Sequence, residues 1–279
     1  MSYARVPCVS TIDLPARGSA GLGHDVPMTT PTLLVFVHGA CLGPWIWTHQ
    51  LVPYFESRGL TCFAPDLHDA WPHPQWSPQV RRLTLARYVD RLHGLLGAWP
   101  GHRILIGHGM GARIAQGLVA QGHRDGLIMI APPAQDAGLK PLQALARAHP
   151  ARFMRAWMER RPLLCFGPQG QPQESAVREL LLHPGASAAL TQSVAAALRD
   201  ESFTACMQWL GRSPWPVDSQ VPTLVLGGRE DPWVPVAALR RTAAAWQATA
   251  QVIPHAGHCP MLGDTALSVA RHIERWLFD

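Results

Sequence analysis

Charged residues are scarce in this sequence. They make up 15% of the chain, and Lys140 is the one lysine among 24 cationic residues, whereas an average soluble domain carries about 25% charged residues. No run of basic residues interleaved with aromatic ones occurs, and the densest local group is Glu159-Arg160-Arg161. Although the formal net charge is +5, the sequence therefore argues against a nucleic-acid partner.

Long hydrophobic runs are also missing. No stretch reaches the roughly 18 apolar residues of a membrane span, and the first thirty residues lack the apolar segment of a signal peptide. The chain is 279 residues long and 47% hydrophobic, which is enough to bury a large core without stabilising disulfide bonds or metals. We expect a soluble, cytoplasmic protein with no membrane partner that acts on a small molecule as a monomer or homodimer.

The cysteine and glycine patterns lack the usual cofactor signatures. The cysteines show neither CxxC spacing nor the density of a disulfide framework, so we expect reduced thiols and no zinc site. The run Gly107-His-Gly-Met-Gly111 is not a dinucleotide fingerprint, because Ala112 stands where the third glycine would be. The sequence thus predicts no cofactor and no metal. The six cysteines are Cys8, Cys41, Cys62, Cys165, Cys206 and Cys259.

Apolar runs of strand length alternate with stretches of helical period along most of the chain. This alternation predicts a mostly parallel central sheet with helices on both faces. Residues 1–31 are rich in Gly, Pro and Ser and hold edge strands at most. The predicted strands are 32–38, 60–64, 103–107, 127–131, 223–228 and 250–253, and the predicted helices are 44–58, 84–99, 110–121, one from about 235, and 261–277.

Residues 133–216 interrupt this rhythm. Prolines separate three or four helical stretches there, and no convincing strand occurs. We expect a helical cap, or lid, inserted after the sixth strand and lying over the carboxyl edge of the sheet. The core would then consist of residues 1–132 and 217–279.

Four of the predicted strands end in segments rich in Gly and His. Ligands of open parallel sheets bind beyond the carboxyl ends of the strands, so these segments are the place to look for chemistry. Each segment alone is weak evidence for a functional site, because Gly and His are common, but the four in this order at these strand ends are strong evidence. They are His38-Gly-Ala-Cys-Leu-Gly-Pro-Trp45, Gly107-His-Gly-Met-Gly111, Gly228-Arg-Glu-Asp-Pro232 and His255-Ala-Gly-His-Cys259.

Through these segments the chain resembles the α/β-hydrolase family over nearly its whole length. The HGAC-x-GPWIW segment, residues 38–47, is similar to the oxyanion loop of the methylesterase and hydroxynitrile-lyase branch. The resemblance implies a nucleophile, an acid and a histidine in that chain order, at positions 109, 231 and 258, which are 122 and 27 residues apart. It also implies that Asp231 and His258 are catalytic and that the Ala40 and Met110 N–H groups form an oxyanion hole.

The sequence departs from the family at the nucleophile. The family's elbow reads G-x-S-x-G, and its middle position here is Gly109, which has no hydroxyl or thiol. Glycine adopts the strained elbow geometry more easily than serine, so the turn and its backbone donors should persist. His258, held by Asp231, would remain a general base near neutral pH.

Several side chains around this site have both a functional and a structural interpretation. His38 could support the oxyanion loop, His108 could pack under the elbow, and Trp45 could belong to the helix-to-sheet core. Asp231 could merely cap a helix, and Cys41 is an alternative nucleophile. The aromatic cap suggests an apolar or aromatic substrate. The predicted substrate contacts are His38, Cys41, Trp45, His108, Trp157 and Trp209.

Three functions remain open from the sequence. The first is an enzyme that uses the Asp231–His258 dyad as a base for lyase, isomerase, cyclase or decarboxylase chemistry, or for hydrolysis by activated water. The second is an esterase or C–C hydrolase inactivated by glycine in place of serine at position 109. The third is a ligand-binding protein without catalysis, against which the retention of both Asp231 and His258 weighs.

Overall fold

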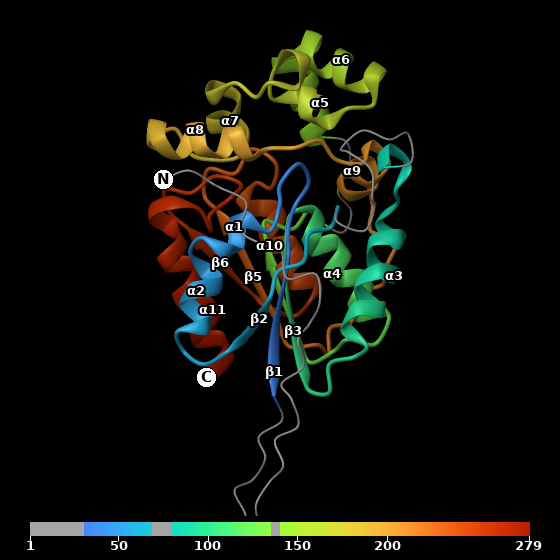
Figure 1. The fold of residues 1–279 in the computed structure, drawn as a ribbon, viewed down its shortest axis with the longest axis vertical. Helices are drawn as coiled ribbons and strands as arrows, with labels where there is room; N and C mark the ends of the chain where they lie inside the picture. The colour runs from blue at the N-terminus through green and yellow to red at the C-terminus, as the bar shows by residue number, and fades with distance from the viewer. Residues whose placement is uncertain (1–30, 69–79, 135–139) are drawn as a thin grey trace, which may run out of the picture.

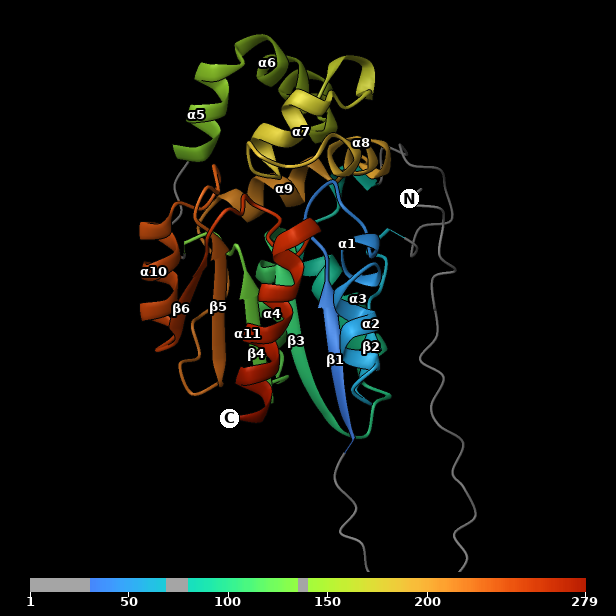
Figure 2. The same ribbon diagram turned by 90° about the vertical axis from the view of Figure 1, so that its left-hand side faces the viewer.

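The computed structural model describes residues 31–68, 80–134 and 140–279. Its centre is a parallel sheet of six strands (Figure 1), whose order β2-β1-β3-β4-β5-β6 can be followed from right to left in Figure 2. The predicted strands between residues 32 and 253 are confirmed, whereas any strand in residues 1–30 lies outside the described residues. The strands are β1 (Thr32–Val37), β2 (Thr61–Phe63), β3 (His102–His108), β4 (Gly126–Ile130), β5 (Thr223–Gly228) and β6 (Thr249–Ile253).

The apolar runs form this sheet because both of its faces are covered. In β1, Leu34 and Phe36 join one core cluster while Leu33, Val35 and Val37 join the other. The register pairs Val37 with Gly107, so neighbouring strands end at the same edge. The predicted sheet covered on both faces is therefore confirmed.

Helices cover the two faces in separate groups, with α2 and α11 to the left of the strands and α3 and α4 to the right in Figure 1. Thr84 caps α3 as predicted, since its side chain accepts a hydrogen bond from the Arg87 N–H. One face carries α3 (Leu85–Leu96), α4 (Met110–Ala120) and α10 (Val236–Ala245), and the other carries α1 (Trp45–Thr48), α2 (Leu51–Glu56) and α11 (Ala266–Phe278).

Two predicted helices differ from the structure. The predicted helix 44–58 is broken between α1 and α2 at His49 and Gln50. Pro53 has no N–H to donate to the His49 carbonyl, which removes one bond of a continuous helix. The predicted helix from Met261 begins only at Ala266, after a short 3-10 turn.

The cap consists of short helices over the carboxyl edge of the sheet (Figures 1 and 2). Within the described residues it follows β4, the fourth strand, so an insertion after the sixth strand would need two strands in residues 1–30. None of the helices in the described ranges is long and apolar enough to cross a bilayer. The cap elements are α5 (Lys140–Ala148), α6 (Pro150–Glu159), the 3-10 turns Pro162–Cys165 and Pro168–Gly170, α7 (Glu174–Leu180), α8 (Ala188–Ala197) and α9 (Phe203–Leu210).

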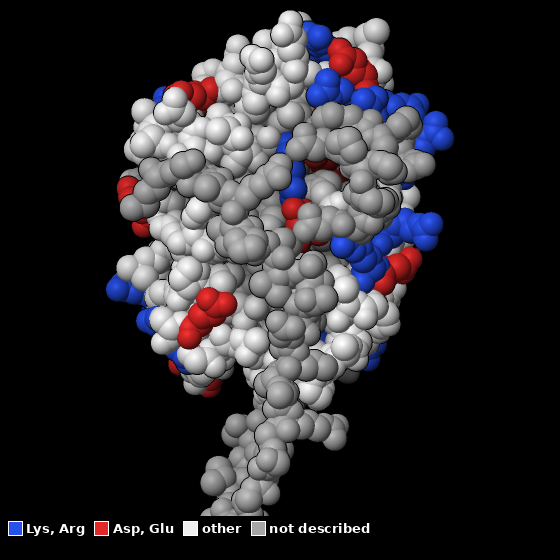
Figure 3. Space-filling model, in the orientation of Figure 1, with Lys and Arg blue, Asp and Glu red and all other residues white. Residues whose placement is uncertain are grey.

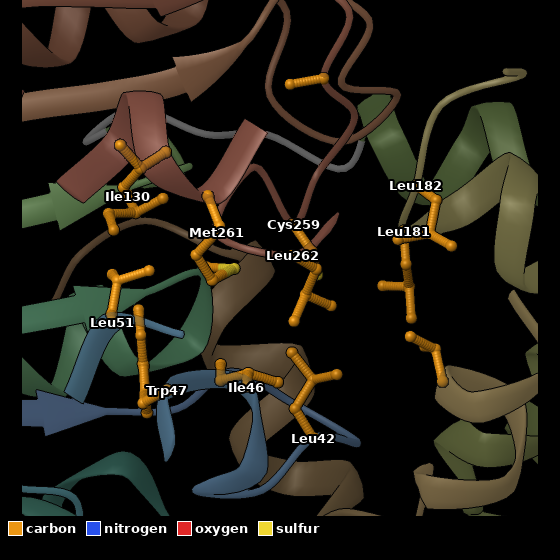
Figure 4. Packing of buried hydrophobic residues seen from close by; sticks show 14 of the residues in the cluster. Leu42, Ile46, Trp47, Leu51, Ile130, Leu181, Leu182, Cys259, Met261 and Leu262 are labelled. Atoms are coloured by element: carbon orange, nitrogen blue, oxygen red, sulfur yellow. The ribbon is translucent and has the colours of Figure 1, made fainter. Parts of the chain in front are cut away.

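The cap and the core share a hydrophobic cluster. Leu181 and Leu182, after α7, belong to the same buried cluster as Leu42 and Leu262 of the core, and Figure 4 shows these side chains together. The Cys259 N–H donates to the Leu181 carbonyl oxygen at 2.8 Å. The cap is therefore fastened to the segment after β6. On the face in Figure 3 the described surface is mostly uncharged, in keeping with the scarcity of charged residues.

Candidate active site

The turn from β3 into α4 has the geometry of a nucleophile elbow. Gly109, between the strand and the helix, has φ 53° and ψ −112°, which is a region that side-chain-bearing residues rarely adopt. Its N–H donates to the Ile130 carbonyl oxygen at 2.9 Å, which ties the turn to the end of β4. The sharp turn is thus formed without a serine.

Asp231 and His258 lie together, as the sequence predicts. His258 Nδ1 lies 2.9 Å from Asp231 Oδ2, and these side chains are 4% and 0% exposed. The other carboxylate oxygen of Asp231 accepts hydrogen bonds from the N–H groups of Trp233 (2.8 Å) and Val234 (3.0 Å). Asp231 therefore orients His258 and also closes the turn that follows it. The alternative in which Asp231 caps a helix is wrong, because α10 begins at Val236 and its N-cap is Pro235.

The free nitrogen of His258 faces Gly109. A Cβ built on Gly109 would stand 3.2 Å from His258 Nε2 and 3.6 Å from Trp209 Cζ2. Since the Nδ1–H donates to Asp231, Nε2 carries the lone pair and can accept a proton. The basic atom therefore points at the place where the family's nucleophile would stand.

The two expected oxyanion donors, Ala40 and Met110, lie in the segments that follow β1 and β3. Met110 is the first residue of α4, so its N–H has no carbonyl partner within the helix. Ala40 sits in the turn after β1, in which the Leu42 N–H donates to the Gly39 carbonyl oxygen. Ala40 and His258 line the same cavity, so an oxyanion hole at these positions would adjoin the base.

The cavity above His258 is almost entirely apolar. Its empty volume is about 700 Å³, including space open to solvent, which is the size of a small-molecule site. Among the described residues that line it, His258 alone is neither apolar nor a cysteine. The lining residues are Ala40, Cys41, Leu142, Leu145, Phe153, Ala156, Trp157, Pro162, Cys165, Phe166, Leu181, Phe203, Cys206, Met207, Trp209, Leu210, Trp233 and His258.

Of the six predicted substrate contacts, Cys41, Trp157 and Trp209 line this cavity. His108 does not, because its Nε2–H donates to the His258 carbonyl oxygen at 2.9 Å and its ring lies under the elbow. Burial is the main cause that lowers the pKa of His108 well below its usual value, and repulsion from His258 lowers it further. His108 is therefore a neutral support for the segment that carries the base.

His38 and Trp45 also lie outside the cavity lining. His38 is fully buried, and its Nε2 accepts from the Leu67 N–H at 3.1 Å while its Nδ1 bonds the Gly39 carbonyl oxygen at 2.9 Å. Burial lowers its pKa, which agrees with a neutral ring that supports the oxyanion loop. Trp45 packs against the core cluster on the α2 side of the sheet.

Cys41 reaches the cavity but has the wrong protonation state for a nucleophile. Burial raises the pKa of its thiol well above the usual value, and Cys206 raises it further. Burial also raises the pKa of Cys165, to about 11. Because the thiolate is the reactive form, these properties argue against the alternative in which Cys41 replaces serine.

One group in the described part of the chain has the spacing of metal ligands. Ligand atoms of His38, Asp66 and His68 lie within 4.8 Å of one another. However, Asp66 pairs with the guanidinium of Arg199, and His38 Nε2 already accepts from the Leu67 N–H. Because the Arg199 guanidinium already neutralises Asp66 and a nitrogen of His38 is already hydrogen-bonded, these residues are better described as a charge network than as a metal centre.

Sequence reasoning missed three residues near this site. Trp233 lines the cavity, and its ring centroid lies 6.4 Å from that of His258. Arg199 and Asp66 form an ion pair behind the oxyanion loop. Trp233 could have been found because it follows Asp231 by two residues, whereas Arg199 is 133 residues from Asp66 in the chain and gives no local signal.

Comparisons with known proteins bear on the family and the fold. The family model described as "Alpha/beta hydrolase family" matches residues 34–271. A curated relative, polyneuridine aldehyde esterase from Rauvolfia serpentina, is 35% identical over 79 residues, which is 28% of this chain and 29% of that protein. The match therefore spans less than a third of that relative's length.

Solved structures share the fold. The crystal structure of polyneuridine aldehyde esterase superposes with a TM-score of 0.64 at 19% identity, covering 88% of this chain and 98% of that one. A pyrethroid hydrolase from Sphingobium faniae JZ-2 gives a TM-score of 0.58 at 20% identity, covering 89% and 97%. These likenesses show a common fold, with esterase-like proteins among its members.

Proposed function

The chain belongs to the alpha/beta hydrolase family, a superfamily made up mostly of enzymes, and on that premise we propose that it catalyses non-covalent, base-driven chemistry. The substrate is a small apolar or aromatic carbonyl or ester compound. His258 is the general base, Asp231 orients it, and the N–H groups of Ala40 and Met110 receive the developing negative charge.

The relation between His258 and Gly109 carries this proposal. The base Nε2 lies 3.2 Å from the position of a Cβ on Gly109, so a substrate atom can occupy the space of the absent nucleophile at hydrogen-bond distance. General bases act at such distances from the proton they remove. Serine chemistry would need an oxygen that this chain does not carry there.

The simplest reaction is removal of a proton from a carbon next to a carbonyl group. The proton passes to His258 Nε2, and the C–H electron pair forms the C=C bond of an enolate whose oxygen takes the charge. Backbone donors at Ala40 and Met110 stabilise that oxygen, and one such donor is worth about 3 kcal/mol in other enzymes. Asp231 stabilises the imidazolium, which then returns the proton to the same or another atom.

A second candidate function is hydrolysis by water, and it is favoured by the same distance between His258 Nε2 and the Cβ position at Gly109. A water oxygen placed 3.2 Å from His258 Nε2 would be within reach of the base and could attack an ester carbonyl held by the oxyanion donors. The curated relative named as an aldehyde esterase supports an ester or carbonyl substrate for this pocket. The apolar lining favours substrates without charge.

Deuterium exchange into an enolisable aromatic ketone tests the proposal. We expect the native chain to exchange the α-hydrogens of 1-indanone in deuterated buffer, followed by NMR, and His258→Ala to lower the protein-dependent rate at least about 100-fold. His255→Ala is the matched control, because His255 is in the same segment but its side chain is 86% exposed. Equal exchange by native protein and His258→Ala would refute the assignment of the base.

A further inference from the structure

The oxyanion loop, residues 39–43, has a strained conformation that needs support from outside. Cys41 has φ 60°, in the left-handed region that residues with a side chain avoid. Such strain persists only where the surroundings impose it. The turn's own Leu42 N–H to Gly39 oxygen bond is long, at 3.4 Å. Other contacts must therefore hold this loop.

Arg199, between α8 and α9 of the cap, supplies those contacts. Its backbone N–H donates to the Cys41 carbonyl oxygen at 3.1 Å, and its side-chain Nε donates to the Leu42 carbonyl oxygen at 3.1 Å. Its Nη2 pairs with Asp66, whose Oδ1 also accepts from the His68 N–H at 2.9 Å. One cap residue thus contacts two consecutive carbonyls of the loop and a core carboxylate.

Gly43 gives a second observation for the same contact. A Cβ on Gly43 would stand 3.0 Å from Arg199 Nη2 and 2.9 Å from Trp45 Cδ1. A side chain at this position would push the guanidinium away from the loop. The glycine in the sequence G-P-W is therefore explained by the close approach of Arg199 and Trp45, not by a positive φ.

The residues after Arg199 anchor the same connection on both sides. Asp200 accepts from Arg161 Nε at 2.7 Å and from the Leu163 N–H at 3.0 Å, both within the cap. Glu201 accepts from the Tyr88 hydroxyl on α3 at 2.7 Å. Arg199 is therefore presented to the loop by a connection that is held by the cap and by the core.

We propose that Arg199 is a positioning residue that clamps the oxyanion loop and so aims the Ala40 N–H at the substrate oxygen. The inference rests on the proposed function for its catalytic meaning, since it deepens the account of the oxyanion hole. The planar guanidinium reaches the Leu42 carbonyl and Asp66 at once, which a lysine ammonium on a flexible stem does not reproduce. Charge alone is therefore insufficient for the clamp.

The test uses the full-length protein in three forms: native, Arg199→Lys and Arg161→Lys. Arg161 is the matched control, because it makes a comparable ion pair with Asp200 in the same junction, on the side of the cap. Hydrogen exchange of residues 38–45, read by mass spectrometry, should be at least about tenfold faster in Arg199→Lys and unchanged in Arg161→Lys. Unchanged exchange in Arg199→Lys would overturn the clamp.

A ligand pair separates the clamp from the proposed function. Quenching of the cavity tryptophans reports binding of 4-nitrophenolate, which carries an oxyanion, and of 4-nitroanisole, which does not. We expect native protein and Arg161→Lys to prefer the phenolate, and Arg199→Lys to lose this preference while keeping its affinity for the anisole. Preference retained in Arg199→Lys would overturn the clamp. Faster loop exchange with no phenolate preference in the native protein would support the clamp and refute the oxyanion hole of the proposed function.

Discussion

His258 Nε2 lies 3.2 Å from the point at which a Cβ on Gly109 would stand. The family's elbow, its acid and its histidine are thus assembled around a position with no side chain.

Replacing Gly109 with serine should create an esterase. The serine Oγ would lie beside His258 Nε2, and the N–H groups of Ala40 and Met110 are the oxyanion donors of the proposed function. The backbone at position 109, with φ 53° and ψ −112°, adds strain of about 1–3 kcal/mol for a residue with a side chain, and His258 must shift by a few tenths of an ångström. Hydrolysis of 4-nitrophenyl acetate measures the outcome, with Gly109→Ala as the control that gains no nucleophile. If Gly109→Ser were as inert as Gly109→Ala, the oxyanion donors would not be aligned with the elbow.

Asp231→Asn should lower catalysis without unfolding the protein. The asparagine oxygen can still accept from the Trp233 and Val234 N–H groups, but its amide would face His258 Nδ1 and favour the tautomer with the proton on Nε2. We expect the ketone exchange rate to fall about 100- to 10,000-fold, with the melting temperature nearly unchanged. A variant with native exchange would show that the carboxylate does not set the tautomer.

The buried ion pairs of His68 should make stability fall in mild alkali. Burial lowers the pKa of His68, but Glu201, with its Oε2 3.1 Å from His68 Nε2, and Asp66 outweigh burial and raise it to about 9. A group whose pKa is raised by folding stabilises fully below its unfolded value, about 6.5, and this contribution is lost as pH rises through the folded value.

The melting temperature of the native protein should therefore fall between pH 6.5 and about 9, by roughly 2–4 °C for each kcal/mol lost. The difference in melting temperature between the native protein and His68→Gln should shrink over the same pH range. A constant difference across this range would mean that His68 is not protonated in the folded state.

The cavity thiols should resist alkylation while the protein is folded. Burial raises the pKa of Cys41 and of Cys206 well above the usual thiol value, so the reactive thiolate is scarce at pH 8. Mass spectrometry after treatment with iodoacetamide should find both residues unmodified in the folded protein and modified in guanidinium chloride. Rapid modification of Cys41 in the folded protein would revive it as a candidate nucleophile.

The sequence predicted the elements that depend on local pattern. The apolar run of β1 and the capping residue Thr84 carry their own signals, and the Asp231 and His258 motifs lie at strand ends whose position follows from the parallel sheet. The break between α1 and α2 was missed because the apolar pattern continues through it, although Pro53 marks the place where a helical hydrogen bond is lost.

The parts that were missed depend on contacts between distant segments. Arg199 reaches the loop after β1 from the far end of the cap, and nothing in its local sequence distinguishes it from other surface arginines. His38 and His108 had both a substrate-binding and a structural interpretation from the sequence, and only the structure decides between them. Their rings turn inward to bond the backbone, at the Leu67 N–H and the His258 carbonyl. Side-chain direction at a strand end is set by packing, which the motif alone does not show.

Deuterium exchange by Gly109→Ala tests the central claim most directly. The substitution adds only a methyl group, 3.2 Å from His258 Nε2, and leaves Asp231, His258 and the oxyanion donors in the chain. If substrate reacts in the space at Gly109, exchange of the 1-indanone α-hydrogens should fall at least about tenfold relative to native protein, with the circular dichroism spectrum unchanged. Native-like exchange by Gly109→Ala would contradict the account, because the reaction would then take place elsewhere.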